Sequence, residues 1–437
     1  MKQGLIIIIT VLSLATVNAQ QVIRFTNPDS LISFAEKNSI AIKTGNAQAL
    51  LAKYQTLYAK INKFNPRASV NYAATDNTQL PVNFFPAEVF GGLPGTFKEV
   101  QSGQQYVQSV YITPQIDVIN PATWEKLKSA RLNEQLASVG NKLAQKNLSE
   151  SIAAAYFNIV SFQQQITITS KTLVHVDSIL LIFQNKFEQG IIRSQDVNNA
   201  KVNKLMIKDR LQQIQNTMEQ QYNLLNLLCD ADEATIIEIE HIENATTALQ
   251  QPVIALNALA VTQSQLQLQY AKSEYKANKA AYYPILSLIG NWAWQENSKL
   301  HFFDNNARWI PTNYIGLRLS YTFPDAGRLS QTATAKSNWQ IAEMNVKHKT
   351  KQQETENVQL YLEFKKAKEI MMVAEEIKLL KEDTYLKNLN LFVQDIYPAD
   401  NLFLAFNDAL MATLNYQAAK INLQYQLFKI NINNSIR

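Results

Sequence analysis

The sequence predicts a mainly α-helical fold with a β portion, built from two copies of one structural unit. Each copy contains, in order, a helix, two alternating strands, a very long helix and a shorter helix. The strands open at residues 64–70 and 283–288, and they end at Asn120-Pro121 and Phe323-Pro324. The offset between the copies is about 218 residues at the strand starts and about 203 at their ends, a difference that a hairpin loop would absorb.

The first 19 residues predict a signal peptide. Lys2 is followed by an apolar run at 5–17, and Val17-Asn18-Ala19 ends in small residues, so we expect cleavage after Ala19. The alternative is a buried N-terminal helix. The run is shorter than the about 20 residues of a spanning helix. We find no later run of that length and therefore expect no membrane-spanning helix.

Composition favours long helices and excludes several classes of protein. Glycine is scarce, at 11 residues in 437, and the net charge of +5 is spread along the chain without a basic run typical of nucleic-acid binding. Cys229 is the one cysteine, so no internal disulfide forms, and its apolar neighbours indicate a small buried side chain rather than a reactive thiol.

The first repeat, residues 20–229, begins with a predicted helix from about 28 to 62, capped by Asn27. Strands are expected at 66–76 and 106–119. A helix follows Pro121 and runs to the turn at Gly190, because no proline interrupts it; its about 68 residues would measure about 100 Å. Ser194 is expected to cap the next helix, which ends near Cys229.

A less regular link, residues 230–251, leads to the second repeat, residues 252–437. Here we expect a helix at 252–281, strands at 284–295 and 314–323, a long helix from 326 to about 391, and a helix from about 400 to 430. In both repeats the two shorter helices together match the long one in length. Shorter helices stacked end to end beside long ones would build a cylinder.

Heptad seams in the long helices predict helix-on-helix packing. An ordinary soluble bundle would carry the same repeats, so the strands must decide between the two architectures. The seam of the first long helix and the two seams of the second are Ile159, Phe162, Ile166, Thr169, Leu173, Val176, Leu180, Phe183 and Phe187; Leu360, Phe364, Ala367, Met371 and Ala374; and Ile370, Val373, Ile377 and Leu380.

The four strands alternate apolar and polar residues over lengths that can cross a bilayer when tilted. In the last strand, for example, Ile315, Leu317 and Leu319 oppose Arg318 and Ser320. Pro114 predicts a bulge or a break in pairing in the second strand. A half-buried sheet packed on a helix would show the same alternation, but strand length and export favour the membrane.

Four strands leave two open edges, and an open edge in lipid leaves backbone amides unsatisfied. The smallest bacterial barrels have about eight strands, so at least two chains, with three favoured, must share one barrel.

These features resemble the TolC family of outer membrane efflux and secretion channels. The resemblance covers nearly the whole mature chain and rests on Pro66, Pro284, and the segments 155–158, 187–200 and 323–328. It implies a homotrimer with a shared 12-stranded barrel and a long helical tunnel across the periplasm. It also implies a passive exit duct of a tripartite efflux or type I secretion system, docked to a periplasmic adaptor and an inner-membrane transporter.

The resemblance also implies site residues. It places helix turns at the periplasmic tip, but in the second copy Asp395 stands where glycine is expected, and Asn401 and Leu404 stand at the two acidic positions. Arg318 would tune anion preference or serve as a simple water-facing charge. The aperture candidates are Gly190, Asp196, Asp395, Tyr397, Asp400 and Asn401, and the barrel-lumen candidates are Arg67, Asp117, Asn291 and Arg318.

No pattern in the sequence predicts catalysis, a cofactor or a metal site. The four histidines are scattered, and nucleotide-binding, zinc-protease and hydrolase motifs are missing. A periplasmic adaptor is the alternative function, and an exported helical enzyme is a third class. Residues 77–105 are read as an extracellular hairpin loop or as a disordered insertion. The sequence does not indicate the cargo.

Overall fold

The computed structural model describes residues 21–232, 235–240, 259–394, 396 and 398–435, so the predicted signal peptide lies outside the described residues. The chain forms two compact units. The helical unit is drawn from Met1–Ala47, Gly140–Ala260 and Thr350–Arg437, and the sheet unit from Gln48–Val139 and Val261–Lys349. Each unit combines segments of both sequence repeats, because each repeat contributes to the sheet and to the helical unit.

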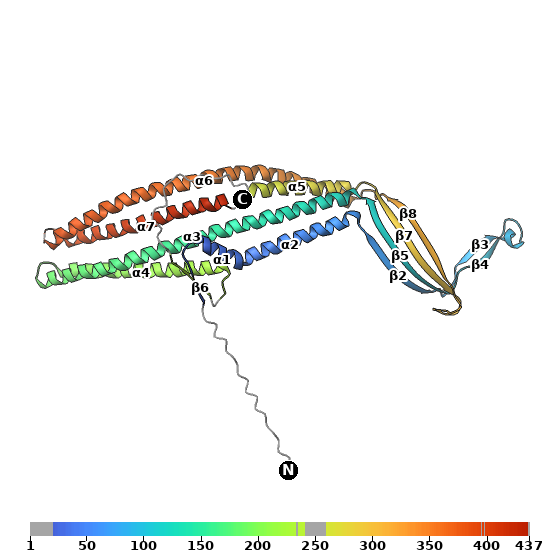
Figure 1. Ribbon diagram of the computed structural model, residues 1–437, viewed down its shortest axis with the longest axis horizontal. Coiled ribbons are helices and arrows are strands. Elements are labelled where there is room, and N and C mark those ends of the chain that lie inside the picture. The colour runs from blue at the N-terminus through green and yellow to red at the C-terminus, as the bar shows by residue number, and fades with distance from the viewer. Residues whose placement is uncertain (1–20, 233–234, 241–258, 395, 397, 436–437) are drawn as a thin grey trace, which may run out of the picture. The chain divides into compact units, whose positions relative to one another are not determined.

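Long helices dominate the chain, as the sequence predicts (Figure 1). Helices α3 (Pro121–Glu188) and α6 (Ala326–Val393) have 68 residues each, and α4 (Ser194–Cys229) and α7 (Ala399–Ser435) have 36 and 37. Helix α5 is described as Leu259–Ala280, so the predicted start at 252 lies outside the described residues. In the helical unit, the α3–α4 hairpin packs against the α6–α7 hairpin.

The predicted first helix is wrong in one respect: it is two helices, α1 (Pro28–Asn38) and α2 (Ile40–Ile61). Asn27 caps α1 as expected, since its Oδ1 accepts a hydrogen bond from Ser30 N at 2.8 Å. Ser39 leaves the helical region with ψ 127°. The N–H of Ile40 then donates to Asp230 Oδ2 at 2.7 Å. A carboxylate 190 residues away thus satisfies the backbone donor at the break, which no local pattern announces.

The link predicted as irregular contains a strand. β6 (Thr235–Ile239) pairs in parallel with β1 (Gln21–Phe25), and neither strand is predicted from the sequence. Arg24 Nε and Glu238 Oε2 lie 2.9 Å apart across the pair. The strands bury Phe25, Ile237 and Ile239 against Ile152, Tyr156 and Ile159 of α3. This parallel pair therefore closes one core of the helical unit.

A second core ties together the ends of the two long hairpins. Phe183 of α3 is fully buried, with its ring centroid 4.7 Å from that of Phe392 and 4.9 Å from that of Phe403. Val176 and Phe183, which belong to the heptad seam of α3, lie in this core, and Ile179 beside the seam lies there too. The seam is buried here because α3 meets helices on more than one side.

The sheet unit contains a four-stranded antiparallel sheet in the order β2-β5-β7-β8. Its strands are β2 (Arg67–Asp76), β5 (Tyr106–Ile119), β7 (Ile285–Ser298) and β8 (Trp309–Ser320). The predicted last strand, 314–323, is displaced: β8 begins five residues earlier and ends before Tyr321 and Phe323. Pairing with β7 explains the early start, since Trp309 faces Glu296 across the ladder.

The loop 77–105 is ordered in part. It contains a hairpin of β3 (Val82–Pro86) and β4 (Phe97–Gln101), joined through a short 3₁₀ helix at Ala87–Phe90. Figure 1 shows this hairpin beyond the ends of the four long strands. The alternative of a disordered insertion is therefore wrong for these residues.

Pro114 lies in the central strand β5, where a proline cannot donate to a ladder. The predicted break in pairing occurs on the β7 side, where the register passes from Ile112–Trp292 to Gln115–Ile289. Opposite this gap stands Gly290. A Cβ there would lie 2.8 Å from Cζ3 of Trp292 and 3.3 Å from Cγ of Pro114. The glycine therefore makes room for the proline ring and the indole.

One helix departs from the expectation that no membrane-spanning run exists. Among the described residues, α3 contains a stretch long and apolar enough to cross a membrane, with a mean hydropathy of 1.5. A helix that packs against its neighbours through an apolar seam can have the same composition, and 22% of this stretch is buried within the chain. Length and composition therefore do not distinguish the two roles.

Candidate functional site

The four-stranded sheet has two chemically different faces. The register places alternate residues of all four strands together, because side chains alternate along each strand. The polar face includes Arg67, Ser69, Asn71, Ser109, Thr113, Gln115, Asp117, Ser287, Asn291, Gln295, Thr312 and Arg318. The apolar face includes Val70, Tyr72, Val110, Ile112, Ile116, Leu286, Leu288, Trp292, Trp294, Ile315, Leu317 and Leu319.

The apolar face is open rather than covered by another layer. Val70, Ile315 and Leu319 are 70, 70 and 71% exposed. A half-buried sheet packed on a helix would bury these side chains. The structure of the single chain therefore disfavours that alternative, and a continuous apolar surface of this extent is typical of a face that contacts another apolar medium.

The sheet also has two unpaired edges among the described residues. β2 and β8 each pair on one side only. The outer N–H and C=O groups of both strands have no strand partner, so each edge can accept a further strand. A two-faced sheet with two free edges is the geometry from which a closed barrel is assembled.

All four lumen candidates, Arg67, Asp117, Asn291 and Arg318, share the polar face. Asp117 lies opposite Ser287 on β7, and Ser287 lies opposite Arg318 on β8. Asn291 is separate from this group, opposite Tyr314. The structure thus brings together three of the candidates at the end of the sheet nearest the helices.

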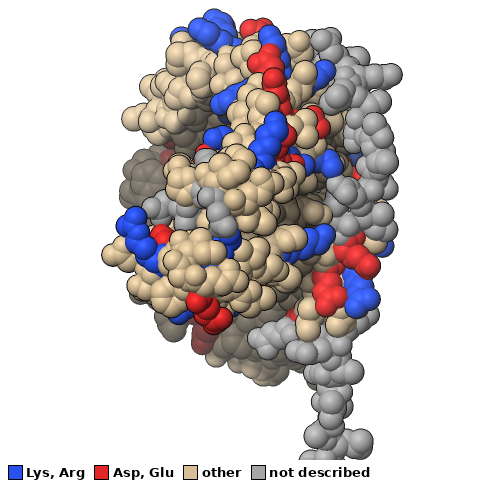
Figure 2. All heavy atoms as spheres, turned by 90° about the vertical axis from the view of Figure 1, so that its left-hand side faces the viewer, with Lys and Arg blue, Asp and Glu red and all other residues tan. Residues whose placement is uncertain are grey.

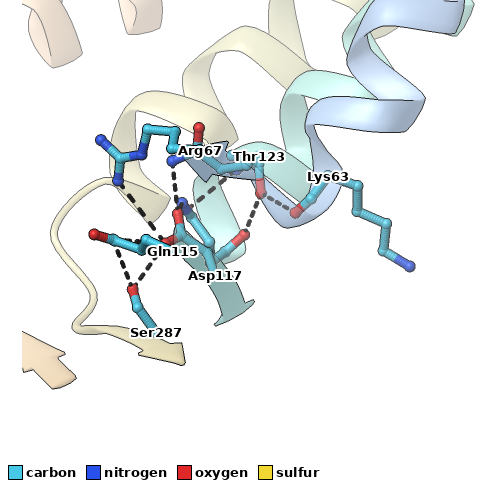
Figure 3. A network of polar contacts seen from close by, with 8 residues as sticks. Lys63, Arg67, Gln115, Asp117, Thr123 and Ser287 are labelled. Atoms are coloured by element: carbon cyan, nitrogen blue, oxygen red, sulfur yellow. Dashed lines mark hydrogen bonds and ion pairs between the residues drawn. The ribbon is translucent and has the colours of Figure 1, made fainter. Parts of the chain in front are cut away.

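Asp117 forms a buried polar network where the sheet joins α3 (Figure 3). Its Oδ2 accepts hydrogen bonds from Asn65 Nδ2 at 2.8 Å and Asn120 Nδ2 at 2.9 Å. Its Oδ1 accepts from Ser287 Oγ at 2.7 Å and Gln115 Nε2 at 3.3 Å. Asp117 is a candidate from the sequence, but its contacts with these four donors, which come from three separate segments, are not predicted by any local pattern.

The local backbone explains how one of these donors, Asn65, reaches Asp117. Asn65 has φ +42°, a left-handed conformation that asparagine tolerates better than most residues. This turn connects the 3₁₀ segment Asn62–Phe64 to β2. Thr123 Oγ1 donates to the carbonyl of Lys63 at 2.9 Å and so ties the first turn of α3 to the same segment. Hydrogen bonds to the Asp117 carboxylate, together with the Thr123–Lys63 bond, thus connect the helix ends to the strands.

A second polar cluster lies at the far end of the apolar face and was missed from the sequence. Gln108 and Glu296 are buried there, with Gln108 Nε2 donating to Glu296 Oε2 at 3.1 Å. Tyr72 OH bonds Gln108 Oε1 at 2.6 Å, and the N–H of Asp304 donates to Glu296 Oε1 at 2.9 Å. The loop between β7 and β8 therefore folds back over this end of the face. Ser298 Oγ donates to Asp304, which lowers the pKa of that carboxyl.

The α3–α4 turn holds two aperture candidates. Gly190 lies in the turn, is exposed, and has φ +71°, a conformation that favours glycine. Asp196 Oδ2 accepts a hydrogen bond from Arg193 N at 2.9 Å. Arg193 is the N-cap residue and Ser194 the first residue of α4, so the expectation that Ser194 caps this helix is wrong. The carboxylate three residues on satisfies the cap instead.

The α6–α7 turn is described in part. Asp395 and Tyr397 lie outside the described residues, Asp400 lies in α7, and Asn401 is exposed on α7. Figure 2 shows this end of the molecule, with lysine and arginine interspersed with aspartate and glutamate. The visible face has no broad field of one sign. An acidic aperture therefore stays a prediction.

No family model matches this sequence, and no curated protein matches it. Solved structures do. The outer membrane protein VceC of Vibrio cholerae is 17% identical over 93% of this chain and 94% of its own, with a TM-score of 0.76. A membrane protein of Pseudomonas aeruginosa is 13% identical over 93% of both chains, with a TM-score of 0.76. The CmeC outer membrane channel of Campylobacter jejuni is 12% identical over 93% of this chain and 85% of its own, with a TM-score of 0.71.

The chain has the TolC-family fold. The predicted fold class, mainly helical with a β portion, is confirmed. At these identities the likeness concerns the fold. Within the TolC-family fold, the two-faced sheet and the helix turns are the parts of this chain that carry the candidate site residues.

Proposed function

We propose that this chain is an outer membrane exit duct, a passive channel that carries cargo from the periplasm to the outside. The two-faced sheet carries the proposal. Its apolar face suits lipid, its polar face suits water, and its free edges need further strands before the sheet can enter a bilayer. The fold is that of proteins described as outer membrane channels, which supports the same assignment.

Closure requires more than one chain. Four strands per chain and three chains would give a 12-stranded barrel, within the range of outer membrane barrels. The trimer would pair the outer edge of β2 with the outer edge of β8 of a neighbour. We propose that Arg67, Asp117, Asn291 and Arg318 then face the lumen.

The helical unit would form the periplasmic part of the duct. We propose that the turns near Gly190, Asp196, Asp395, Tyr397, Asp400 and Asn401 line its aperture, and that a periplasmic adaptor and an inner-membrane transporter dock there, as in a tripartite efflux or type I secretion system. The duct needs no cofactor and catalyses no reaction. The alternative is a periplasmic adaptor. It is disfavoured because a soluble protein rarely exposes an apolar surface as large as the open face of this four-stranded sheet.

The migration of the unheated protein on a denaturing gel tests the proposal. Outer membrane fractions should contain a species of trimer size that collapses to a monomer near 49.6 kDa, less the signal peptide, after boiling. The trimer should resist the detergent of the gel because each chain needs hydrogen bonds from its neighbours to satisfy the backbone amides at the two edges of its sheet. A mature chain that is monomeric and soluble without detergent would contradict the proposal.

A further inference from the structure

A row of residues crosses the sheet at the end nearest the helices. It consists of Asp117, Ser287 and Arg318, which face one another on β5, β7 and β8, together with Arg67 on β2. We name these four residues the basal row. They contain all the charged side chains on the polar face of the four strands, since the other residues of that face are uncharged.

The negative charge of the basal row is buried within the chain. Asp117 is 1% exposed, and both its oxygens are occupied by the amide and hydroxyl donors described above. Arg67 Nη2 lies 4.0 Å from Oδ1, at the outer limit of an ion pair. The carboxylate therefore has no free oxygen for a cation in the adjacent water.

The positive charges of the row are exposed on the polar face. The Arg67 side chain is 61% exposed. Arg318 is also exposed, and no ion pair involves it among the described residues. Two arginines against one buried aspartate leave the polar face with a net charge of one positive unit per chain.

We propose that the basal row makes this section of the lumen favour anions, so that the cargo class it admits best is anionic. The inference rests on the proposed function, because it takes the polar face to be the lumen wall. A fixed charge acts on mobile ions within about 8 to 10 Å at about 0.1 M salt. The preference is therefore local to the row and falls as salt rises.

A cysteine reporter tests this without depending on whether the helix tip is open. Ser320→Cys places a thiol on the polar face two residues from Arg318, about 7 Å along the strand. Its rates of reaction with an anionic and a cationic methanethiosulfonate reagent of similar size are compared in liposome-embedded protein. The ratio of the rates cancels any change in the pKa of the reporter. Cys229 is buried and stays silent.

We expect the anionic reagent to react faster by about three- to tenfold near 0.01 M salt, the Coulomb effect of a unit charge at this distance in water. The ratio should approach one at about 1 M salt, where the Debye length is about 3 Å. Adding Arg318→Gln should remove most of the preference at low salt.

Two controls isolate the row. Thr312→Cys lies on the same face but six residues from Arg318, about 20 Å away, and should show little preference. Arg308→Gln removes an equal charge from the loop before β8 and should leave the Ser320→Cys ratio unchanged.

The outcomes separate the inference from the proposed function. If the Ser320→Cys thiol reacts with both reagents at equal rates at low salt, or if Arg318→Gln does not alter the ratio, the anion preference is wrong and the duct stands. If neither aqueous reagent reaches the thiol while a membrane-permeant one does, the polar face is not a lumen wall, and both proposals fail.

Discussion

Burial governs the side chains of the helical unit that would otherwise be reactive. Burial raises the pKa of the Cys229 thiol to about 12, with the charge of Asp230 adding to the effect. Burial likewise raises the pKa of Tyr156 to about 12, and the Tyr156 hydroxyl donates to the carbonyl of Thr26. Both residues therefore contribute to packing in the core beside β1 and β6, as the apolar neighbours of Cys229 predict.

We expect the Cys229 thiol to resist labelling in the folded protein. At pH 8 a thiol with a pKa near 12 is ionised to about one part in ten thousand, and the thiolate is the nucleophile. A maleimide assay should show labelling in denaturant and almost none in the native protein. Rapid native labelling that rises little between pH 7 and pH 9 would contradict a buried, neutral thiol.

At the scale of elements, the two long helices are continuous, whereas the predicted first helix is interrupted. α3 and α6 run for 68 residues without proline inside. The first helix breaks at Ser39 although Ser39 is not a strong breaker, because Asp230 offers a hydrogen bond to the next amide. A side chain from another segment thus shortens a helix that its own sequence would continue.

Phe183 and Phe187 give a matched test of the core at the helix ends. Phe183 is fully buried between two rings, and Phe187, one turn further along α3, is 46% exposed. Phe183→Ala should cost about 3 to 5 kcal/mol of local stability because it leaves a cavity, and Phe187→Ala much less.

Limited proteolysis of the α3–α4 hairpin at increasing urea concentration measures this local opening. The Phe183→Ala protein should be cut at clearly lower urea than the parent, and the Phe187→Ala protein close to it. Equal sensitivity of the two variants would show that the aromatic core does not hold these helix ends.

At the scale of the whole molecule, the hairpin ends are linked by more than apolar packing. Lys186 of α3 is buried, donates to the carbonyl of Val393 at 3.3 Å, and lies over the ring of Phe392. A cation at the last carbonyls of α6 is favourable because the C-terminal end of a helix is negative. These contacts join the α3–α4 hairpin to the α6–α7 hairpin within one chain.

We predict that the assembled channel is closed at its helix tip at rest, and that opening separates α6 and α7 from α3 and α4. Planar-bilayer recordings of the pure trimer should therefore give small, brief currents. Lys186→Met, which removes the cation but keeps the length of the side chain, should enlarge them. A wide and permanently open current from the parent protein would contradict a closed tip.

The sequence by itself determined which segments become long helices or alternating strands, and which residues of a strand share a face. These features depend on proline and glycine positions and on apolar periods of 3.6 or 2 residues. Such signals are local, so they can be recognised without knowing which segments pack together. That is why Asp117, Arg67 and Arg318 could be placed on one face, and why the turn at Gly190 could be predicted.

Only the tertiary structure decided the contacts that join distant segments. It paired β1 with β6, ended the first helix through Asp230, and gathered four donors around Asp117. It also folded the loop before β8 over Glu296, at the far end of the apolar face. Such contacts depend on side chains far apart in the chain, and no local period encodes them.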